Sequence, residues 1–227
     1  MILRIYVRFA LAALIVCIFG CNESGKPKAN ETQVNAILKV NAPVTSDTTK
    51  DKQDIQTLIR SLLLWAEDHK GVPDLLPFVI NRQDSTVTGF DLTKLKGVDD
   101  SLKTTGFFSE EFINNYNQIV QMLDRRMKNK KIAPFSTGEI PPFGFNTDAD
   151  PWCDCQDVPY ESPNAYNLVD VHIIELNSEG GKMYWTWGSL PKGVSPDWRT
   201  VTYKFNVTKE YGKWKISYLQ GFDIKRA

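Results

Sequence analysis

Asp170 and His172 are the two side chains in this chain best suited to acid–base chemistry. Residues two apart on a β-strand point to the same face, so the pair can meet if the segment is a strand. An imidazole beside a carboxylate can move protons. The other use of the pair is structural, as surface polar groups or a hydrogen-bonded core histidine. No Gly-x-Ser-x-Gly motif and no glycine-rich phosphate loop is present, which disfavours nucleophilic hydrolysis.

An acidic segment downstream of residue 145 is a second candidate for chemistry. Its possible cation ligands are Asp148, Asp150, Asp154 and Asp157. Hard oxygen ligands at such spacing can hold Ca²⁺, but the EF-hand pattern fails, because Trp152 occupies the third ligand position and Cys153 replaces the required glycine. Aspartates in Pro-rich loops also cap turns. We therefore expect no metal and no cofactor.

Aromatic side chains give the stronger indication of binding. The candidate ligand- or partner-binding residues are Trp152, Tyr184, Trp185, Trp187 and Trp198. On a strand over 182–188, Trp185 and Trp187 share one face and Tyr184 lies on the other. One aromatic face can fill the core while the other lines a pocket or an interface, and core packing alone is the alternative.

The N-terminal 21 residues are typical of a bacterial secretion signal. Arg4 and Arg8 precede an apolar run from Phe9 to Phe19, which is too short for a spanning helix. The following residues, Ile18-Phe19-Gly20-Cys21, resemble a lipobox, although Phe19 is bulkier than usual. The resemblance implies cleavage before Cys21, lipidation of its thiol, and attachment to a membrane of the bacterial cell envelope. Asn22 resembles a signal for sorting to the outer membrane.

If Cys21 carries lipid, as the resemblance implies, Cys153 and Cys155 have only each other as disulfide partners within the mature molecule. An export compartment is oxidising. A Cys-Asp-Cys disulfide would close a very small ring. A disulfide, a free pair and an intermolecular bridge therefore all stay open, whereas zinc would need two further ligands.

Residues 22–50 contain no aromatic residue and are rich in polar residues. Such a segment buries too little apolar surface to fold, so we predict a flexible tether with a reach of about 30 Å. Residues 51–227 are long enough for a single domain with one core. The complete chain has 27 basic and 27 acidic residues, a balance that argues against a nucleic-acid partner.

Two helices are predicted within the first half of this domain. Apolar residues at helical spacing predict the first over 51–68, capped by Asp51 or Asp54. Ser109 is the predicted N-cap of the second, with Phe108 and Ile113 as its hydrophobic staple. Basic residues crowd the C-terminal end of this second helix: Arg125, Arg126, Lys128, Lys130 and Lys131. That cluster is either a phosphate- or lipid-surface patch or a solvated helix end that suits the helix dipole.

The intervening segment 74–104 is less regular. Leu75–Ile80 is predicted to be a short helix or turn, 86–91 has weak strand character, and Asp99 and Asp100 begin a predicted loop. The last 60 residues alternate apolar and polar side chains, which predicts an antiparallel meander. Its predicted strands cover residues 167–177, 182–188, 199–208 and 213–223.

Helices followed by a meander predict an α+β fold, with N-terminal helices packed on a curved antiparallel sheet. The order is similar to the nuclear-transport-factor-2-like, or cystatin-like, cone fold. The segments that resemble this fold and a bacterial exported family of unknown function are Phe108-Ser109-Glu110-Glu111, Asp150-Pro151-Trp152, Gln156-Asp157 and Tyr211-Gly212-Lys213-Trp214-Lys215-Ile216. The resemblance implies a pocket at the open end of the cone and no particular activity.

These observations predict a lipid-anchored envelope protein whose domain binds a small molecule, a peptide or a protein partner. An immunity or inhibitor protein is one version of this prediction. The alternatives are a pocket enzyme using Asp170 and His172 or the 150–157 loop, and a structural component of the envelope.

Overall fold

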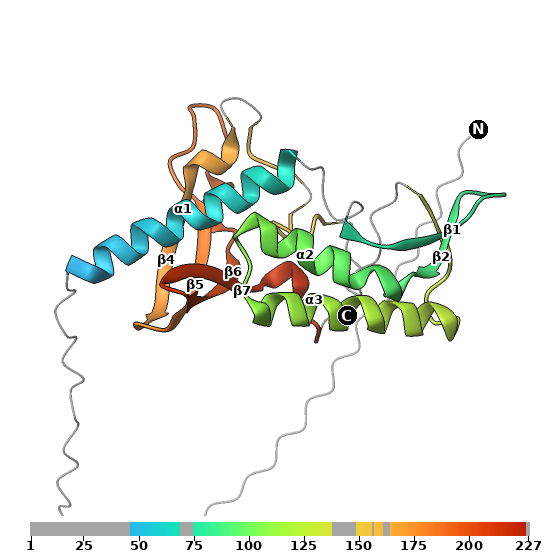
Figure 1. Cartoon of the computed structure of the whole chain (residues 1–227). Helices are drawn as coiled ribbons and strands as arrows, with labels where there is room; N and C mark the ends of the chain where they lie inside the picture. Colours follow the sequence, from blue (N-terminus) through green and yellow to red (C-terminus); the bar gives the residue numbers. More distant parts are fainter. Residues whose placement is uncertain (1–45, 69–74, 138–148, 156, 161–163, 226–227) are drawn as a thin grey trace, which may run out of the picture. The chain divides into compact units, whose positions relative to one another are not determined.

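The computed structural model describes residues 46–68, 75–137, 149–155, 157–160 and 164–225. All of them belong to one compact unit, Pro43–Ala227. Helices combine with antiparallel sheets, which confirms the α+β class (Figure 1). The α-helices described are α1 (Ser46–Asp68), α2 (Leu95–Thr105) and α3 (Glu110–Lys128), and the 3-10 helices are η2 (Leu92–Lys94), η3 (Ala165–Leu168), η4 (Pro196–Thr200) and η5 (Gln220–Phe222). Within the described ranges, no helix is long and apolar enough to span a bilayer.

The strands form a small sheet and a larger one. The small sheet has the order β1-β2-β3, made of β1 (Phe78–Asn81), β2 (Thr86–Phe90) and β3 (Phe135–Ser136). The larger sheet has the order β4-β5-β6-β7, made of β4 (Val169–Leu176), β5 (Gly180–Trp187), β6 (Tyr203–Glu210) and β7 (Lys213–Leu219). Every pair of neighbouring strands is antiparallel, so the predicted C-terminal meander is confirmed.

Helix α1 packs against the larger sheet, where it contacts β4 and β7 (Figure 1). Its buried face consists of Ile55, Ile59, Leu62, Leu63 and Ala66, which follows the predicted helical spacing. The helix begins at Ser46, within the segment predicted to be a tether. Asp51 therefore lies inside the helix and is not its cap.

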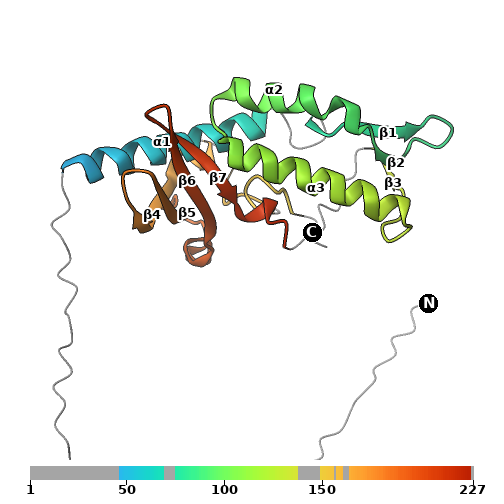
Figure 2. The ribbon, with the colours of Figure 1, turned by 60° about the horizontal axis from the view of Figure 1, so that its bottom comes forward.

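Helix α3 begins as predicted. The Ser109 hydroxyl accepts a hydrogen bond from the Phe112 backbone N–H (3.2 Å), and Phe108 and Ile113 are both buried. The residues just before the helix pair with β7, because Ser109 N–H donates to the Ile216 carbonyl (3.0 Å). The start of α3 is thus fixed to the edge of the larger sheet, and its later turns contact β2 of the small sheet (Figure 2).

The prediction for residues 74–104 was partly wrong. The last three residues of the predicted helix or turn, 78–80, belong to strand β1, which pairs with β2. Asp99 and Asp100 do not begin a loop but lie within α2. The sequence of this helix is mostly polar, and its buried residues are only Leu95 and Leu102, so it has no apolar periodicity that would predict a helix. The two aspartates are stabilised by side-chain contacts instead, with Asp100 paired to Lys96 (2.8 Å) and Asp99 accepting from the Asn117 amide (2.8 Å).

The predicted strand ends at 199 and 223 also differ from the structure. Residues Pro196–Thr200 form η4, and β7 stops at Leu219, where η5 begins. A β-bulge opposite Asn206 and Val207 shifts the alternation of β7. The side chain of Leu219 is buried as a result. Strict alternation from the buried Trp214 and Ile216 would bury Tyr218 instead, but Tyr218 is only half-buried.

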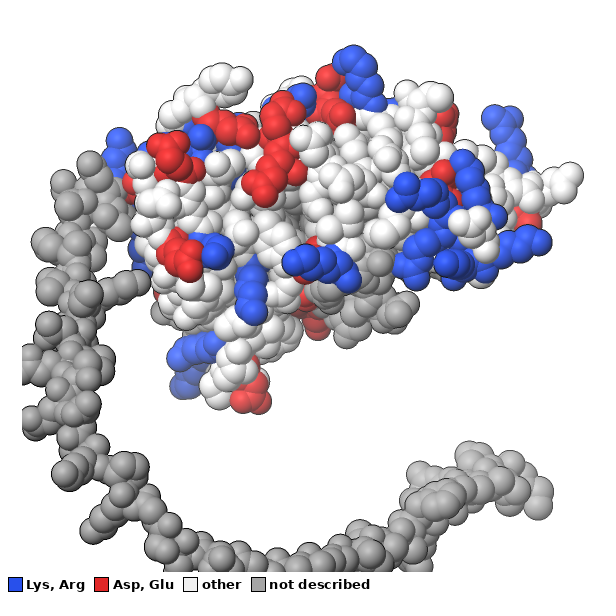
Figure 3. Space-filling view, turned by 90° about the horizontal axis from the view of Figure 1, so that it is seen from below, with Lys and Arg blue, Asp and Glu red and all other residues white. Residues whose placement is uncertain are grey.

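Charged side chains of both signs are scattered over the surface seen in Figure 3, most of which is uncharged. At the end formed by the β1–β2 hairpin and the C-terminal turns of α3, however, blue basic side chains gather.

Candidate functional site

The structure brings Asp170 and His172 together on β4, on the face turned away from the core. The His172 Nε2 atom lies 3.8 Å from Asp170 Oδ2 and 3.0 Å from the hydroxyl of Thr186 on β5. The imidazole also stacks on the ring of Tyr184, with centroids 4.8 Å apart. Both side chains remain more than a third exposed. Asp170 and His172 therefore lie close together, but both side chains are accessible to water.

A shallow hollow of about 450 Å³ includes this pair. Its polar lining comprises Arg60, Asp170, His172, Thr186, Ser189 and Arg199. Arg60 is already used in the fold, because its Nε donates to the Val169 carbonyl (2.9 Å). The hollow offers a proton-transfer pair beside cationic groups, but it lacks the water-excluded environment that strengthens such chemistry.

The Cys-Asp-Cys segment is a tight, mostly buried turn closed by a disulfide between Cys153 and Cys155, whose Cα atoms are 5.1 Å apart. Asp150 caps this turn by accepting from the Trp152 N–H (2.9 Å). Burial raises the pKa of the Asp150 carboxyl above its usual range.

The candidate cation ligands serve mainly as turn and loop partners. Asp154 accepts from the Gln220 amide (2.6 Å), and Asp157 accepts from the Val158 N–H (2.8 Å). Asp148 lies outside the described residues. Among the residues described, no three His, Cys, Asp or Glu side chains come together as a metal site would require.

The predicted aromatic residues divide into core and surface groups. Trp152, Trp185 and Trp187 are each at most 2 % exposed. Trp185 stacks on Tyr203, with ring centroids 3.9 Å apart. These three side chains therefore fill the core, which was the alternative to a binding role. Tyr184 and Trp198 are half-buried, and they are the members of the predicted set that a ligand could reach.

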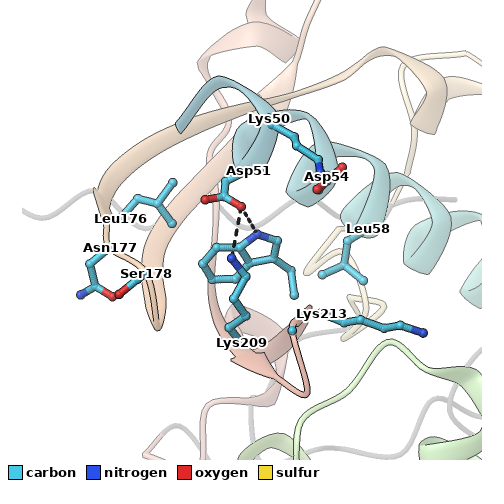
Figure 4. Close-up of a pocket in the computed structure, with 11 residues that line it drawn as sticks. Lys50, Asp51, Asp54, Leu58, Leu176, Asn177, Ser178, Lys209 and Lys213 are labelled. Atoms are coloured by element: carbon cyan, nitrogen blue, oxygen red, sulfur yellow. Dashed lines mark hydrogen bonds and ion pairs between the residues drawn. The ribbon is translucent and has the colours of Figure 1, made fainter. Parts of the chain in front are cut away.

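A larger pocket lies where the first turns of α1 meet the ends of both hairpins of the larger sheet. Figure 4 shows this pocket, which has a volume of about 730 Å³. Its centre is an interaction between residues 163 positions apart, in which the Trp214 indole N–H donates to Asp51 Oδ1 (2.8 Å). The Lys209 ammonium lies 3.4 Å from the same oxygen and 4.5 Å from the centroid of the Trp214 ring.

The walls of this pocket are amphipathic. Leu58 and Leu176 supply aliphatic surface, and Asn177 and Ser178 contribute the polar tip of the β4–β5 hairpin. Lys50, Lys213 and Asp54 also line the pocket, and Figure 4 shows Lys50 beside Asp54. Neither lysine lies within ion-pair distance of a carboxylate that the structure describes. The three lysines of the lining, Lys50, Lys209 and Lys213, exceed its two aspartates, Asp51 and Asp54, by one positive charge. This excess beside apolar walls suits a ligand that has both a carboxylate and an apolar part.

Sequence reasoning did not identify this pocket. It treated Asp51 as a helix cap and Trp214 as one of the apolar residues of a strand. The signal available was an indole N–H in a buried strand position, because such a group needs an acceptor. The sequence does not show which of its 27 acidic residues supplies that acceptor.

Comparison with known proteins adds little. No protein-family model matches the chain, and no curated protein matches it significantly. The chain is similar to a protein of unknown function from Bacteroides thetaiotaomicron VPI-5482, whose crystal structure was determined at 2.10 Å resolution. The two share 16 % identity over 78 % of this chain and 96 % of the other, with a TM-score of 0.35, too low to establish a common fold. Cys21 and most of the predicted tether lie outside the described residues.

Proposed function

We propose that this protein is exported, anchored by lipid at Cys21 to a membrane of the bacterial envelope, and acts there as a binding protein. The observation that carries the anchoring is Ile18-Phe19-Gly20-Cys21 directly after the short apolar run. Several acyl chains on one cysteine give durable attachment, whereas one gives marginal binding.

The disulfide between Cys153 and Cys155 supports export independently of the N-terminal segment. Disulfides persist in oxidising compartments and are rare in a reducing cytosol. Both cysteines are buried in this turn, with 3 % and 8 % of their surfaces exposed. A buried pair of this kind suits a structural role in an exported protein better than a redox-active one.

The pocket around Asp51, Lys209 and Trp214 is the proposed binding site. Its size suits a small molecule or a few residues of a peptide. Lys50 and Lys213 would bind a carboxylate of the ligand, and the apolar wall would take its aliphatic or aromatic part. The exposed Asp170–His172 pair gives less support to an enzyme, because its hollow is shallow and solvated.

We also propose that the domain is a variant of the nuclear-transport-factor-2-like cone, from the exported family of unknown function that the sequence resembles. The packing of α1 against β4 and β7 supports this proposal, since a helix covers one face of an antiparallel meander. In such a cone, the pocket at the ends of the hairpins would open at its rim.

Anchoring is tested by intact-mass measurement of the protein purified from its own membranes. We expect a chain beginning at Cys21 and carrying acyl groups, and a Cys21→Ser variant that no longer fractionates with membranes. A mature chain without lipid, or one that retains the first 20 residues, would exclude the anchor.

Binding is tested by native mass spectrometry of the same preparation. We expect a co-purified small molecule or peptide that is retained by wild type and lost by Lys213→Glu, which reverses a charge in the pocket. Lys192→Glu is the matched control, because Lys192 is also exposed but lies outside the pocket. Equal retention by both variants would place the ligand elsewhere, and an absent ligand would leave the pocket without its proposed role.

A further inference from the structure

Six basic side chains meet at one end of the described domain. Five come from the last turns of α3 and the residues after it, and the sixth, Arg82, comes from the tip of the β1–β2 hairpin. Figure 3 shows basic side chains gathered over this end. We call this surface the basic end, and it consists of Arg82, Arg125, Arg126, Lys128, Lys130 and Lys131.

The fold holds the hairpin against the helix end. The Phe90 backbone N–H donates to the buried Asp124 carboxylate of α3 (3.2 Å). Strand β3, which follows α3, pairs with β2, and the Thr137 N–H donates to the Ser85 carbonyl (3.0 Å). Arg82 is thereby placed on the same end as residues that follow it by more than 40 positions.

Most of this positive charge has no counter-charge nearby. Lys128 pairs with Asp124 (2.7 Å). The other five members form no ion pair with any carboxylate in the described ranges. The hairpin itself has a single carboxylate, Asp84, which accepts hydrogen bonds from the N–H and hydroxyl of Thr86, so five of the six basic charges at this end have no ion-pair partner among the described residues.

Capping of α3 does not account for these side chains. The chain turns back after the helix, with Lys130 in a left-handed conformation (φ 56°). Backbone N–H groups of Asn129 and Lys131 then donate to the carbonyls of Arg125 and Arg126. Because the backbone satisfies these carbonyls, the basic side chains are not needed to cap the helix. All of them are exposed except Arg126, which is half-buried.

Two exposed aliphatic side chains lie on the same hairpin. β1 is the outer strand of its sheet, and no described strand pairs with its far edge. Val79 and Ile80 are successive residues of β1, so their side chains project to opposite faces of the strand, and they are 44 % and 47 % exposed. Flexible cations beside exposed aliphatic side chains form an amphipathic surface of the kind that binds the headgroup region of a bilayer.

We propose that the basic end binds an anionic lipid bilayer and so orients the domain on the membrane to which it is attached. This inference rests on the proposed lipid anchor, since the tether would hold the start of α1 within about 30 Å of the bilayer and so raise the effective concentration of the domain there. The basic end lies at the opposite end of the domain from the start of α1 (Figure 1). The exposed aliphatic pair favours a bilayer over an acidic protein, because headgroups and acyl chains satisfy both parts of the surface together. Each basic residue near an anionic membrane contributes about fivefold to binding.

The test uses the lipidated protein on vesicles of phosphatidylcholine alone and of phosphatidylcholine mixed with phosphatidylglycerol. The anchor holds the protein on both, so a difference in amide hydrogen exchange reports docking of the domain. We expect slower exchange at residues 79–86 and 125–131 on the anionic vesicles only, with the difference lost at high salt. The variant R125Q/K130Q/K131Q should lose docking affinity by on the order of a hundredfold and exchange as on phosphatidylcholine.

The matched control is K192Q/K204Q/K225Q, which removes three exposed lysines outside the basic end and should dock as wild type does. Equal exchange on both kinds of vesicle would overturn the proposal, and so would a triple variant that still docks. If the true partner of the basic end is an acidic protein, exchange will be equal on both kinds of vesicle. If the protein fails to float with phosphatidylcholine vesicles, it lacks the lipid anchor. In that case, flotation with the anionic vesicles would support binding by the basic end, and failure to float with them would overturn it.

Discussion

Pro151 packs directly against Gly221, leaving no room for a side chain at the glycine. A Cβ on Gly221 would lie 2.7 Å from the Pro151 Cα and closer still to its carbonyl oxygen. The contact joins the disulfide turn to η5, and the hydrogen bond from the Gln220 amide to Asp154 strengthens it. It also seats Trp152 against the ring of Phe222, with centroids 4.6 Å apart.

Gly221→Ala should therefore destabilise the protein by about 1 to 3 kcal/mol through overpacking. Denaturant unfolding followed by tryptophan fluorescence measures the change. Gly97→Ala is the control, because nothing lies within 4 Å of a Cβ at that position in α2. This second variant should stabilise the protein by about 0.5 to 1 kcal/mol through helix propensity. Equal effects of the two variants would contradict the close approach.

The disulfide should contribute less to the free energy of unfolding than Trp152, the tryptophan beside it. A loop of three residues removes little entropy from the unfolded chain, so Cys153→Ser with Cys155→Ser should cost about 1.5 kcal/mol. Trp152→Ala should cost about 3 to 5 kcal/mol, because the indole is 2 % exposed and lies among aromatic rings. The free energies of unfolding of both variants test this order, and a double serine variant that fails to fold would reverse it.

In the proposed pocket, Asp51→Ala should destabilise the protein by about 1 to 3 kcal/mol, because the indole N–H of the largely buried Trp214 would lose its acceptor. Asp54→Ala, one turn further along α1 and exposed, should change stability by less than about 0.5 kcal/mol. Thermal unfolding of the two variants at the same pH makes the comparison. Similar losses from both would mean that helix charge, and not the indole contact, is responsible.

Asp150 should make the protein less stable as the pH rises. Burial raises its folded-state pKa above 3.8, so the folded chain keeps the proton to higher pH than the unfolded chain does. Its contribution to the free energy of unfolding therefore falls between the unfolded and folded pKa values and stays low above them.

Asp150→Asn should accordingly be more stable than wild type at neutral pH, because the amide oxygen can still accept from the Trp152 N–H. The two proteins should converge as the pH falls below 3.8. Urea unfolding across this pH range measures the difference in free energy of unfolding between the two proteins. The other carboxylates are the same in both proteins, so their contributions cancel in this difference. A less stable Asn variant at neutral pH would show that the charge is stabilised, as a bound cation would do.

The elements that sequence periodicity predicts well are those whose pattern is local. The Ser109 cap, the apolar face of α3 and the antiparallel meander all depend on neighbours within a few residues. The errors arise where distant residues decide. Helix α2 gains its partner, Asn117, from another helix, and the bulge in β7 depends on its pairing with β6.

The candidate sites divide in the same way. The Asp170–His172 contact follows from strand alternation, and so does the opposite orientation of Tyr184 and Trp185. The pocket joins Asp51 to Trp214, and the basic end joins Arg82 to α3, across separations that no local pattern encodes. Asp124 shows the difference most directly, since a carboxylate on the apolar face of a helix is explained only by its bonds to Lys128 and Phe90.

His172→Ala should leave binding unchanged and alter stability by less than about 0.5 kcal/mol, because the imidazole is 38 % exposed on the outer face of β4. Trp185→Ala, on the opposite face of the same sheet, should cost about 3 to 5 kcal/mol through loss of its packing on Tyr203. Retention of the co-purified ligand and denaturant unfolding, measured on both variants, separate function from stability. If His172→Ala abolished the activity of a stably folded protein, the Asp170–His172 pair would be the functional centre and the binding proposal would be wrong.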